Sequence, residues 1–189
     1  MRFMFLIYFL KLFYEARTYE NIALHKPAWQ QHTAIGMGAD RAVDGRYSDL
    51  SGGGGQCSIS GYGHTTAEWR VDLGDVHSID RIFIQYLTEN ALWNGNNSYA
   101  SDFLGFSLYI SNTIRKEDWV LCFKDNTYTK ETIPNPLNIS CRLSGRYVIY
   151  YNNRTHPPFP EDYSEYAVFT LCEIEVYGIT ITFRLECII

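Results

Sequence analysis

The sequence has little of what marks a catalytic, zinc-binding or nucleic-acid-binding protein. Its five cysteines include no C-x-x-C pair, which argues against a structural zinc site. It also lacks G-x-S-x-G, H-E-x-x-H and Walker patterns, the motifs of serine hydrolases, zinc proteases and P-loop enzymes. A net charge of -5 without a basic stripe argues against nucleic-acid binding. No segment is long and apolar enough to span a membrane, so a non-catalytic globular domain is the first interpretation.

Helical periodicity is also scarce, whereas aromatic residues are abundant. They make up 16% of the 189 residues, including 15 Tyr and 11 Phe, and 14 Gly are spread through the chain. Such a composition favours a β-rich globular domain over helices or disorder. The length is enough for one domain with a hydrophobic core and a short appendage.

Short runs of alternating apolar and polar residues predict strands at 67–73, 80–87, 105–111, 119–123, 145–151 and 167–178. In the last run the two kinds of side chain fall on opposite faces, Cys172, Ile174 and Val176 against Glu173, Glu175 and Tyr177. Because alternation implies one buried face, we expect antiparallel sheets packed as a β-sandwich.

The amino terminus and the glycosylation sequons indicate a secreted protein. Residues 1–16, with an early Arg and then an apolar run, are interpreted as a cleaved signal peptide; a partly exposed amphipathic arm is the alternative. Asn-x-Ser/Thr sequons occur at Asn96, Asn138 and Asn153. Sequons together with spaced cysteines favour an extracellular, disulfide-bearing glycoprotein.

The final segment, residues 179–189, is apolar and carries the odd cysteine, Cys187. It has two interpretations, an added edge strand or the start of another extracellular module. We favour the second, because five cysteines cannot all pair within one chain.

Five short blocks follow one another in a characteristic order: 21–28 (NIALHKPA), 42–45 (AVDG), 68–74 (EWRVDLG), 145–148 (GRYV) and 171–178 (LCEIEVYG). In order and spacing they resemble the fucolectin-like (F-type lectin) domain, a relative of the discoidin and coagulation-factor C-type modules. The resemblance covers residues 20–178. It implies an all-β fold, a jelly-roll β-sandwich of the galactose-binding-domain-like type.

Two acidic residues far apart in the sequence are candidate metal ligands. Asp44 lies in a glycine-containing turn whose carbonyls can point inward, and Glu173 lies in the last predicted strand. The resemblance implies a calcium ion held by the side chains of these two residues, by the main-chain oxygens of Arg41, Arg46 and Cys172, and by Gln56, which stands where the family has a serine. Without an ion, Asp44 would cap a turn and Glu173 would be a solvated strand residue.

The resemblance also implies two disulfides, Cys57–Cys172 and Cys122–Cys141. The first would tie the metal loop to the last strand. The second would close a loop of about 20 residues and contribute roughly 3 kcal/mol. The sequence alone leaves the pairing of the cysteines open.

The residues with which such lectins hold fucose are missing. The family uses a His two residues after the first cysteine, where this chain has Ile59. It then uses two arginines, but no Arg or Lys occurs between Arg81 and Arg115, and the aligned positions are Leu87 and Asp102. Because these charge-assisted donors are absent, the usual fucose clamp cannot form.

The loop that stands in this region contains Trp93, Asn94 and Tyr99, which could stack on a sugar or seat a protein partner. The alternative is a loop glycosylated at Asn96, with Trp93 folded onto the core. Both interpretations stay open from the sequence.

We therefore predict a non-catalytic extracellular recognition module that binds calcium and a glycan or glycoprotein. Two other classes stay open. One is a protein-interaction or adhesion module of a larger receptor-like protein with an extracellular protein partner, and the other is the accessory domain of a hydrolase.

Overall fold

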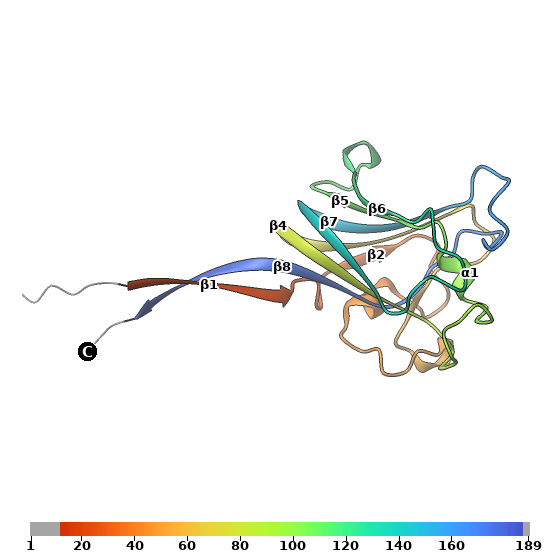
Figure 1. Cartoon of the computed structure of the whole chain (residues 1–189), viewed down its shortest axis with the longest axis horizontal. Coiled ribbons are helices and arrows are strands. Elements are labelled where there is room, and N and C mark those ends of the chain that lie inside the picture. Colours follow the sequence, from red (N-terminus) through yellow and green to blue (C-terminus); the bar gives the residue numbers. More distant parts are fainter. Residues whose placement is uncertain (1–11, 187–189) are drawn as a thin grey trace, which may run out of the picture.

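Strands are the main regular elements of the described part of the chain, residues 12–186 of this computed structural model (Figure 1). Eight strands lie in this range: β1 (Leu12–Asn21), β2 (Ala28–Gln30), β3 (Ser58–Ile59), β4 (Thr66–Tyr86), β5 (Ser107–Ser111), β6 (Val120–Lys124), β7 (Leu137–Asn153) and β8 (Thr170–Glu186). Four short helical segments lie between them: η1 (Ala39–Val43), η2 (Gly52–Gly54), α1 (Ala100–Phe103) and η3 (Lys116–Asp118).

The strands pair antiparallel along one path, β1-β8-β4-β7-β5-β6, with β2 added to β4 and β3 added to β8. The first half of β4 pairs with β2 and the end of β7, whereas its second half pairs with β8 and the start of β7. Trp69 and Val71 from the first half, and Ile82 and Ile84 from the second, are fully buried in the same core. Strand β4 therefore contributes to both layers, and the prediction of an all-β jelly-roll β-sandwich is confirmed.

A bend in β4 accounts for one difference from the sequence prediction. The register between β4 and β7 shifts twice between Asp72 and Arg81, and Gly74 has a φ of 92°. Extra residues in one strand of an antiparallel pair bend and twist it without ending the pairing. The runs predicted as separate strands, 67–73 and 80–87, are for this reason parts of one strand.

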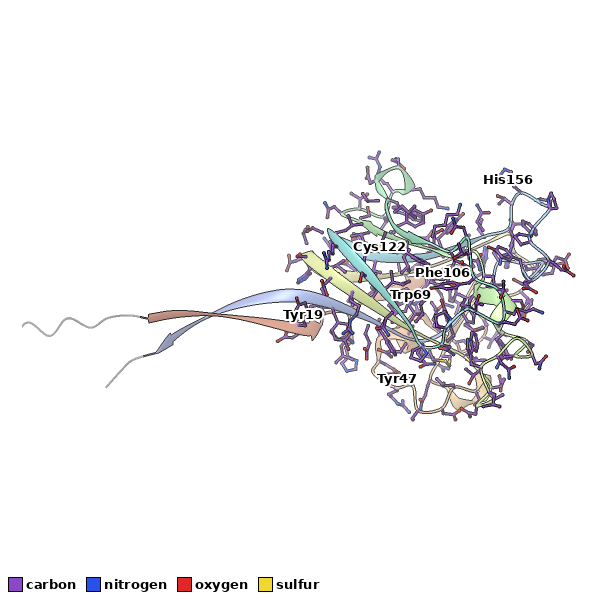
Figure 2. All side chains as sticks on the ribbon, in the orientation of Figure 1. Tyr19, Tyr47, Trp69, Phe106, Cys122 and His156 are labelled. Carbon is purple, nitrogen blue, oxygen red and sulfur yellow. A yellow bond between two sulfur atoms is a disulfide. The ribbon has the colours of Figure 1, made fainter. Side chains whose placement is uncertain are left out.

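Large aromatic side chains fill the space between the layers. Trp69 is fully buried, and its indole Nε1 donates to the Ala39 carbonyl at 3.0 Å. Phe106 stacks on Tyr150 with ring centroids 5.1 Å apart. Figure 2 shows Trp69 and Phe106 in the middle of the body. Burial of a large apolar side chain contributes about 1.5–3 kcal/mol to the stability of the folded chain.

Both expected disulfides are present, Cys57–Cys172 and Cys122–Cys141. The first joins the segment before β3 to β8. The second joins the edge strand β6 to β7. The pairing that the resemblance implied is thus confirmed.

Strand β1 and the end of β8 form a two-stranded ribbon that projects from the body (Figure 1). Their register runs from Leu12↔Glu186 to Asn21↔Tyr177. The first part of the final segment therefore continues β8 as a strand.

The predicted signal peptide and tail are covered only in part. Residues 12–16 lie in β1, whereas residues 1–11 and Cys187 lie outside the described residues. Cleavage of a signal peptide and a further module remain predictions. Within residues 12–186, none of the helices has the length and hydropathy needed to cross a membrane.

Candidate functional site

Glu173 is fully buried in β8, although it lies on the strand face turned away from the core. Cys172 and Ile174 fill the core face, so alternation sends Glu173 to the other side. Its exposed fraction is 0% because the turn after η1 folds over it, and the Gly45 amide donates to Glu173 Oε2 at 3.1 Å. The alternative in which Glu173 is a solvated strand residue is therefore wrong.

One oxygen of this carboxylate has no partner. Oε2 accepts the Gly45 amide, but Oε1 is buried and accepts no hydrogen bond within the described residues. Burial raises the pKa of Glu173 to about 8; the Gly45 amide opposes this shift, and the charges of Asp44 and Glu175 add to it. A buried carboxylate of this kind requires either a proton or a cation.

Asp44 lies directly beside this buried group. It follows η1, and its Oδ1 accepts the Arg46 amide at 2.9 Å, which is the turn-capping role expected without an ion. Gly45 between them has a φ of 76°, and a Cβ there would lie 3.1 Å from Leu24 Cδ1, so the turn requires glycine. The structure thus brings together Asp44 and Glu173 from distant parts of the chain, as predicted.

The residues whose main-chain oxygens were predicted as ligands lie close to the two acidic residues in the sequence. Arg41 lies in η1 and Arg46 in the following turn, so both surround Asp44 in sequence. Cys172 lies where the register of β4 and β8 passes from Gln85↔Glu173 to Tyr86↔Leu171, so it has no partner residue in β4. A residue left over in such a shift has unpaired main-chain groups on that side.

The side chain of Gln56 is already engaged, because its Oε1 accepts the Asp49 amide at 3.0 Å and the Ser48 hydroxyl at 3.4 Å. Within the described range, no three side chains of His, Cys, Asp or Glu gather at one place. A cation here would take most of its ligands from main-chain oxygens. Calcium accepts such a set, whereas zinc prefers nitrogen and sulfur, so the residues present fit calcium.

The second candidate region is the loop end, which we define by Tyr62, Glu89, Tyr99 and Asp102. It contains the positions at which the fucose-holding residues were missing. Leu87 is fully buried there against the Cys57–Cys172 disulfide. The structure therefore gives Leu87 a packing role in place of a donor role.

Asp102 in α1 is 4% exposed and holds the base of the loop end. Burial raises the pKa of Asp102 to about 6, although the Arg154 charge and hydrogen bonds from Tyr62 and Ser164 oppose the shift. Tyr62 itself is 66% exposed, so its ring is presented to solvent; partial burial and the Asp102 charge raise the pKa of Tyr62.

Tyr99 completes the loop end. Its hydroxyl donates to Glu89 Oε1 at 3.1 Å, and burial, this bond and the charges of Glu89, Tyr62 and Asp102 raise the pKa of Tyr99. Two phenol rings thus lie near two carboxylates. Aromatic faces can stack on a sugar ring and carboxylate oxygens can accept sugar hydroxyls, whereas the described loop end offers no guanidinium.

Trp93 and Asn94 were predicted to bind a ligand together with Tyr99, but their side chains are bonded to main-chain groups of the protein. The Trp93 indole donates to the Ile133 carbonyl at 2.7 Å, and its ring lies against Tyr86 and Phe103 with centroids 5.9 and 6.1 Å away. This is the arrangement folded onto the core that the sequence left open. Asn94 is exposed, and its side chain accepts a main-chain amide of its own loop at 2.9 Å.

Arg154 is a buried cation that the sequence pattern did not predict. It is nearly inaccessible, and its guanidinium donates to the carbonyls of Leu104 at 2.7 Å and Ser164 at 2.9 Å. It therefore fastens the segment after α1 to the loop before β8. Its position inside the Asn-Arg-Thr sequon gave no sign of burial.

The three sequon asparagines, Asn96, Asn138 and Asn153, are all exposed. Their accessibility is what an attached glycan requires.

The chain matches no protein-family model and no curated protein sequence. Its structure is nevertheless similar to several solved structures. The lectin domain of lectinolysin complexed with Lewis B antigen gives a TM-score of 0.63 at 23% identity, with 84% of this chain and 96% of that chain covered.

Two further solved structures give the same picture. A fucolectin from the serum of Morone saxatilis (striped bass) has a TM-score of 0.62 and 24% identity, covering 85% of this chain and 49% of that chain. A Streptococcus pneumoniae fucose-binding module has a TM-score of 0.62 and 22% identity, covering 84% and 98%. The chain therefore shares the fold that the sequence resemblance implied.

Proposed function

We propose that this chain is a non-catalytic extracellular recognition module that binds glycans at its loop end and is stabilised by calcium. The observation that carries the proposal is the fold, which it shares with lectin domains and a fucose-binding module along most of its length. Fold alone does not fix a ligand, so the ligand class rests on the loop end.

The loop end favours a neutral sugar over the usual fucose arrangement. Tyr62 and Tyr99 supply ring faces, and the exposed Glu89 supplies an acceptor for hydroxyl groups. No arginine is available, because Arg154 is committed to main-chain carbonyls. An anionic sugar would meet like charges here.

Calcium would have a structural role. Glu173 Oε1, the orphaned buried atom, and Asp44 would bind it, with the main-chain oxygens of Arg41, Arg46 and Cys172 completing the set. An ion would replace the proton that burial of Glu173 otherwise demands. The same ion would fix the turn that covers β8.

Two features support an extracellular setting. The two disulfides suit an oxidising compartment, and the three sequon asparagines are accessible. Secretion through residues 1–16 and occupancy of the sequons are part of this proposal.

A glycan array read with calcium present tests the function. We expect binding to neutral glycans, and loss of that binding in Tyr62→Ala, because the exposed ring is removed. Tyr147→Ala, a half-buried tyrosine on β7 away from the loop end, is the matched control. A blank array for the wild-type chain would contradict glycan recognition, and a Tyr62→Ala array equal to the wild type would move the site away from the loop end.

A further inference from the structure

A pocket of 380 Å³ lies on the outer side of β5, β6 and β7, apart from the loop end and the calcium site. Its floor is a row of three side chains, because Ser107 pairs with Lys124 on one side and with Tyr151 on the other. Cross-strand partners share a face of the sheet. The neighbouring Leu108 points into the core, so this row faces outward.

Aromatic rings form the walls of the pocket. Tyr109 and Tyr151 rise from the strands, and Phe159 and Tyr163 close it from the loop before β8. Arg154 supports the positions of Phe159 and Tyr163. The buried Arg154 guanidinium lies 4.8 Å from the Tyr163 ring centroid and 5.8 Å from that of Phe159.

A glycine leaves room for the Tyr163 ring in the wall of the pocket. Gly105 has a φ of 75°, and a Cβ there would clash with the Tyr163 ring. The Tyr163 amide also donates to the Pro160 carbonyl at 3.0 Å. The wall is thus held by packing and hydrogen bonding and does not need a ligand to form.

The polar groups of the pocket differ in availability. The Asp125 carboxylate is committed, because it accepts the amides of Gly105 at 2.8 Å, Thr127 at 3.0 Å and Tyr128 at 2.9 Å. The side chains of Lys124 and Asn126 are exposed and make no hydrogen bond or ion pair within residues 12–186. The pocket therefore offers ring faces together with uncommitted donors.

We propose that this pocket is a second saccharide site on the side of the sandwich. Its volume falls in the range of about 300–1,000 Å³ typical of small-ligand pockets. A pyranose has an apolar face that can stack on Tyr151 and a rim of hydroxyls that Lys124 and Asn126 can bind. A proline-rich peptide is the competing occupant of an aromatic pocket, and the test below distinguishes it from a saccharide.

The chain itself can deliver a sugar to this place. Asn153 and Thr155 of one sequon line the pocket, and Asn153 Oδ1 accepts the Thr155 amide at 2.9 Å. A glycan on Asn153 would begin at the pocket wall. The saccharide therefore has two sources, a glycan on Asn153 or a separate glycan; only the first rests on the proposed glycosylation.

The test uses N,N′-diacetylchitobiose, which corresponds to the first two sugars of an N-linked glycan. It is titrated into the full chain made without glycosylation, and main-chain amide shifts are followed by NMR. We expect shifts at Gly105 and Asn153. Binding should be at least about tenfold weaker in Tyr151→Ala and weaker in Lys124→Ala, whereas Tyr147→Ala, on the same strand and face, should bind normally.

A second arm uses the glycosylated chain before and after removal of its glycans. If chitobiose causes amide shifts only after the glycans are removed, the Asn153 glycan is the natural occupant. If the shifts are equal before and after removal, the natural occupant is a separate glycan. Absence of shifts in the unglycosylated chain, or shifts that Tyr151→Ala leaves unchanged, would overturn the proposal. Binding of a proline-rich peptide without binding of chitobiose would also overturn the proposal. Tyr62→Ala should leave chitobiose binding at this pocket unchanged, so the proposals for this pocket and for the loop end can be refuted independently.

Discussion

Replacing Glu173 by Gln should change stability in opposite directions according to whether calcium is present. Without calcium, burial raises the pKa of Glu173 from 4.5 to about 8, so the folded chain at about pH 7 must take up a proton that the unfolded chain lacks. The gap of about 2.5 pH units, at about 1.4 kcal/mol per unit, costs about 3 kcal/mol. Glutamine is neutral and of similar shape, so Glu173→Gln should be the more stable protein in a chelator by up to this amount.

Calcium should reverse the order. An ion that binds the folded chain at 1,000 times its dissociation constant adds about 4.1 kcal/mol, which exceeds the burial cost of about 3 kcal/mol, and the wild-type carboxylate would then be paired. Glu173→Gln loses that ligand and should melt at the same temperature with and without calcium. For a chain of this size, a difference of about 3 kcal/mol corresponds to about 6–12 °C in Tm.

Thermal unfolding of both proteins, with chelator and with millimolar calcium, measures this reversal. Glu175→Gln is the control, because Glu175 lies on the same face of β8 but is half-exposed and bonded to Tyr47 and Tyr177. The difference in chelator should also vanish as the pH falls to about 4, where the carboxyl is protonated in both states. Wild-type melting that ignores both chelator and calcium would refute the calcium site, and a less stable Glu173→Gln in chelator would refute the burial cost.

Two further predictions concern carboxylates away from the calcium site. Burial raises the pKa of Asp102 from 3.8 to about 6, so the stability of the folded chain falls as the pH rises from about 4 to about 6. This fall is worth at most about 3 kcal/mol. Urea unfolding across this pH range should show that Asp102→Asn removes it. In the opposite sense, two Arg146 hydrogen bonds of 2.7 Å help lower the pKa of Asp72 to about 2. Stability from this pair is present above about pH 4 and is lost as the pH falls toward 2. Because Arg146 is 42% exposed, water screens the pair, and Arg146→Ala should lower stability only slightly at neutral pH and leave it unchanged in strong acid.

The last strand was the most predictable part of the fold. Alternation placed Cys172, Ile174 and Val176 on the core face, and all three are fully buried. The burial of Glu173 could not be predicted in the same way, because alternation distinguishes two faces but does not say what covers the outer one. Here the cover is a turn at Gly45, more than a hundred residues earlier in the chain.

Other misses have a local explanation. The first half of β7 alternates buried Leu137, Ile139 and Cys141 with exposed Asn138 and Ser140, so a strand signal was present and was not used. The continuity of β4 could not be seen from sequence, because a glycine after a strand is typical of a turn as well as of a bulge.

Arg154 was unpredictable for a different reason. Charged residues in loops are usually exposed, and this one is buried only because carbonyls from Leu104 and Ser164 converge on it. That convergence depends on the tertiary fold. The wall of the side pocket, which rests on Arg154, was hidden from the sequence for the same reason.

The ribbon of β1 and β8 has a mechanical consequence. Because its strands are antiparallel, a force that separates their outer ends would open the hydrogen-bonded pairs one after another, as in a zipper, and would not shear them together. The opening would meet resistance at Asn21, whose Oδ1 accepts the amides of Ala23 and Val176, both at 3.1 Å. Beyond that point the covalent link from Cys57 to Cys172 would bear the load, so the ribbon can yield to tension while the sandwich stays closed.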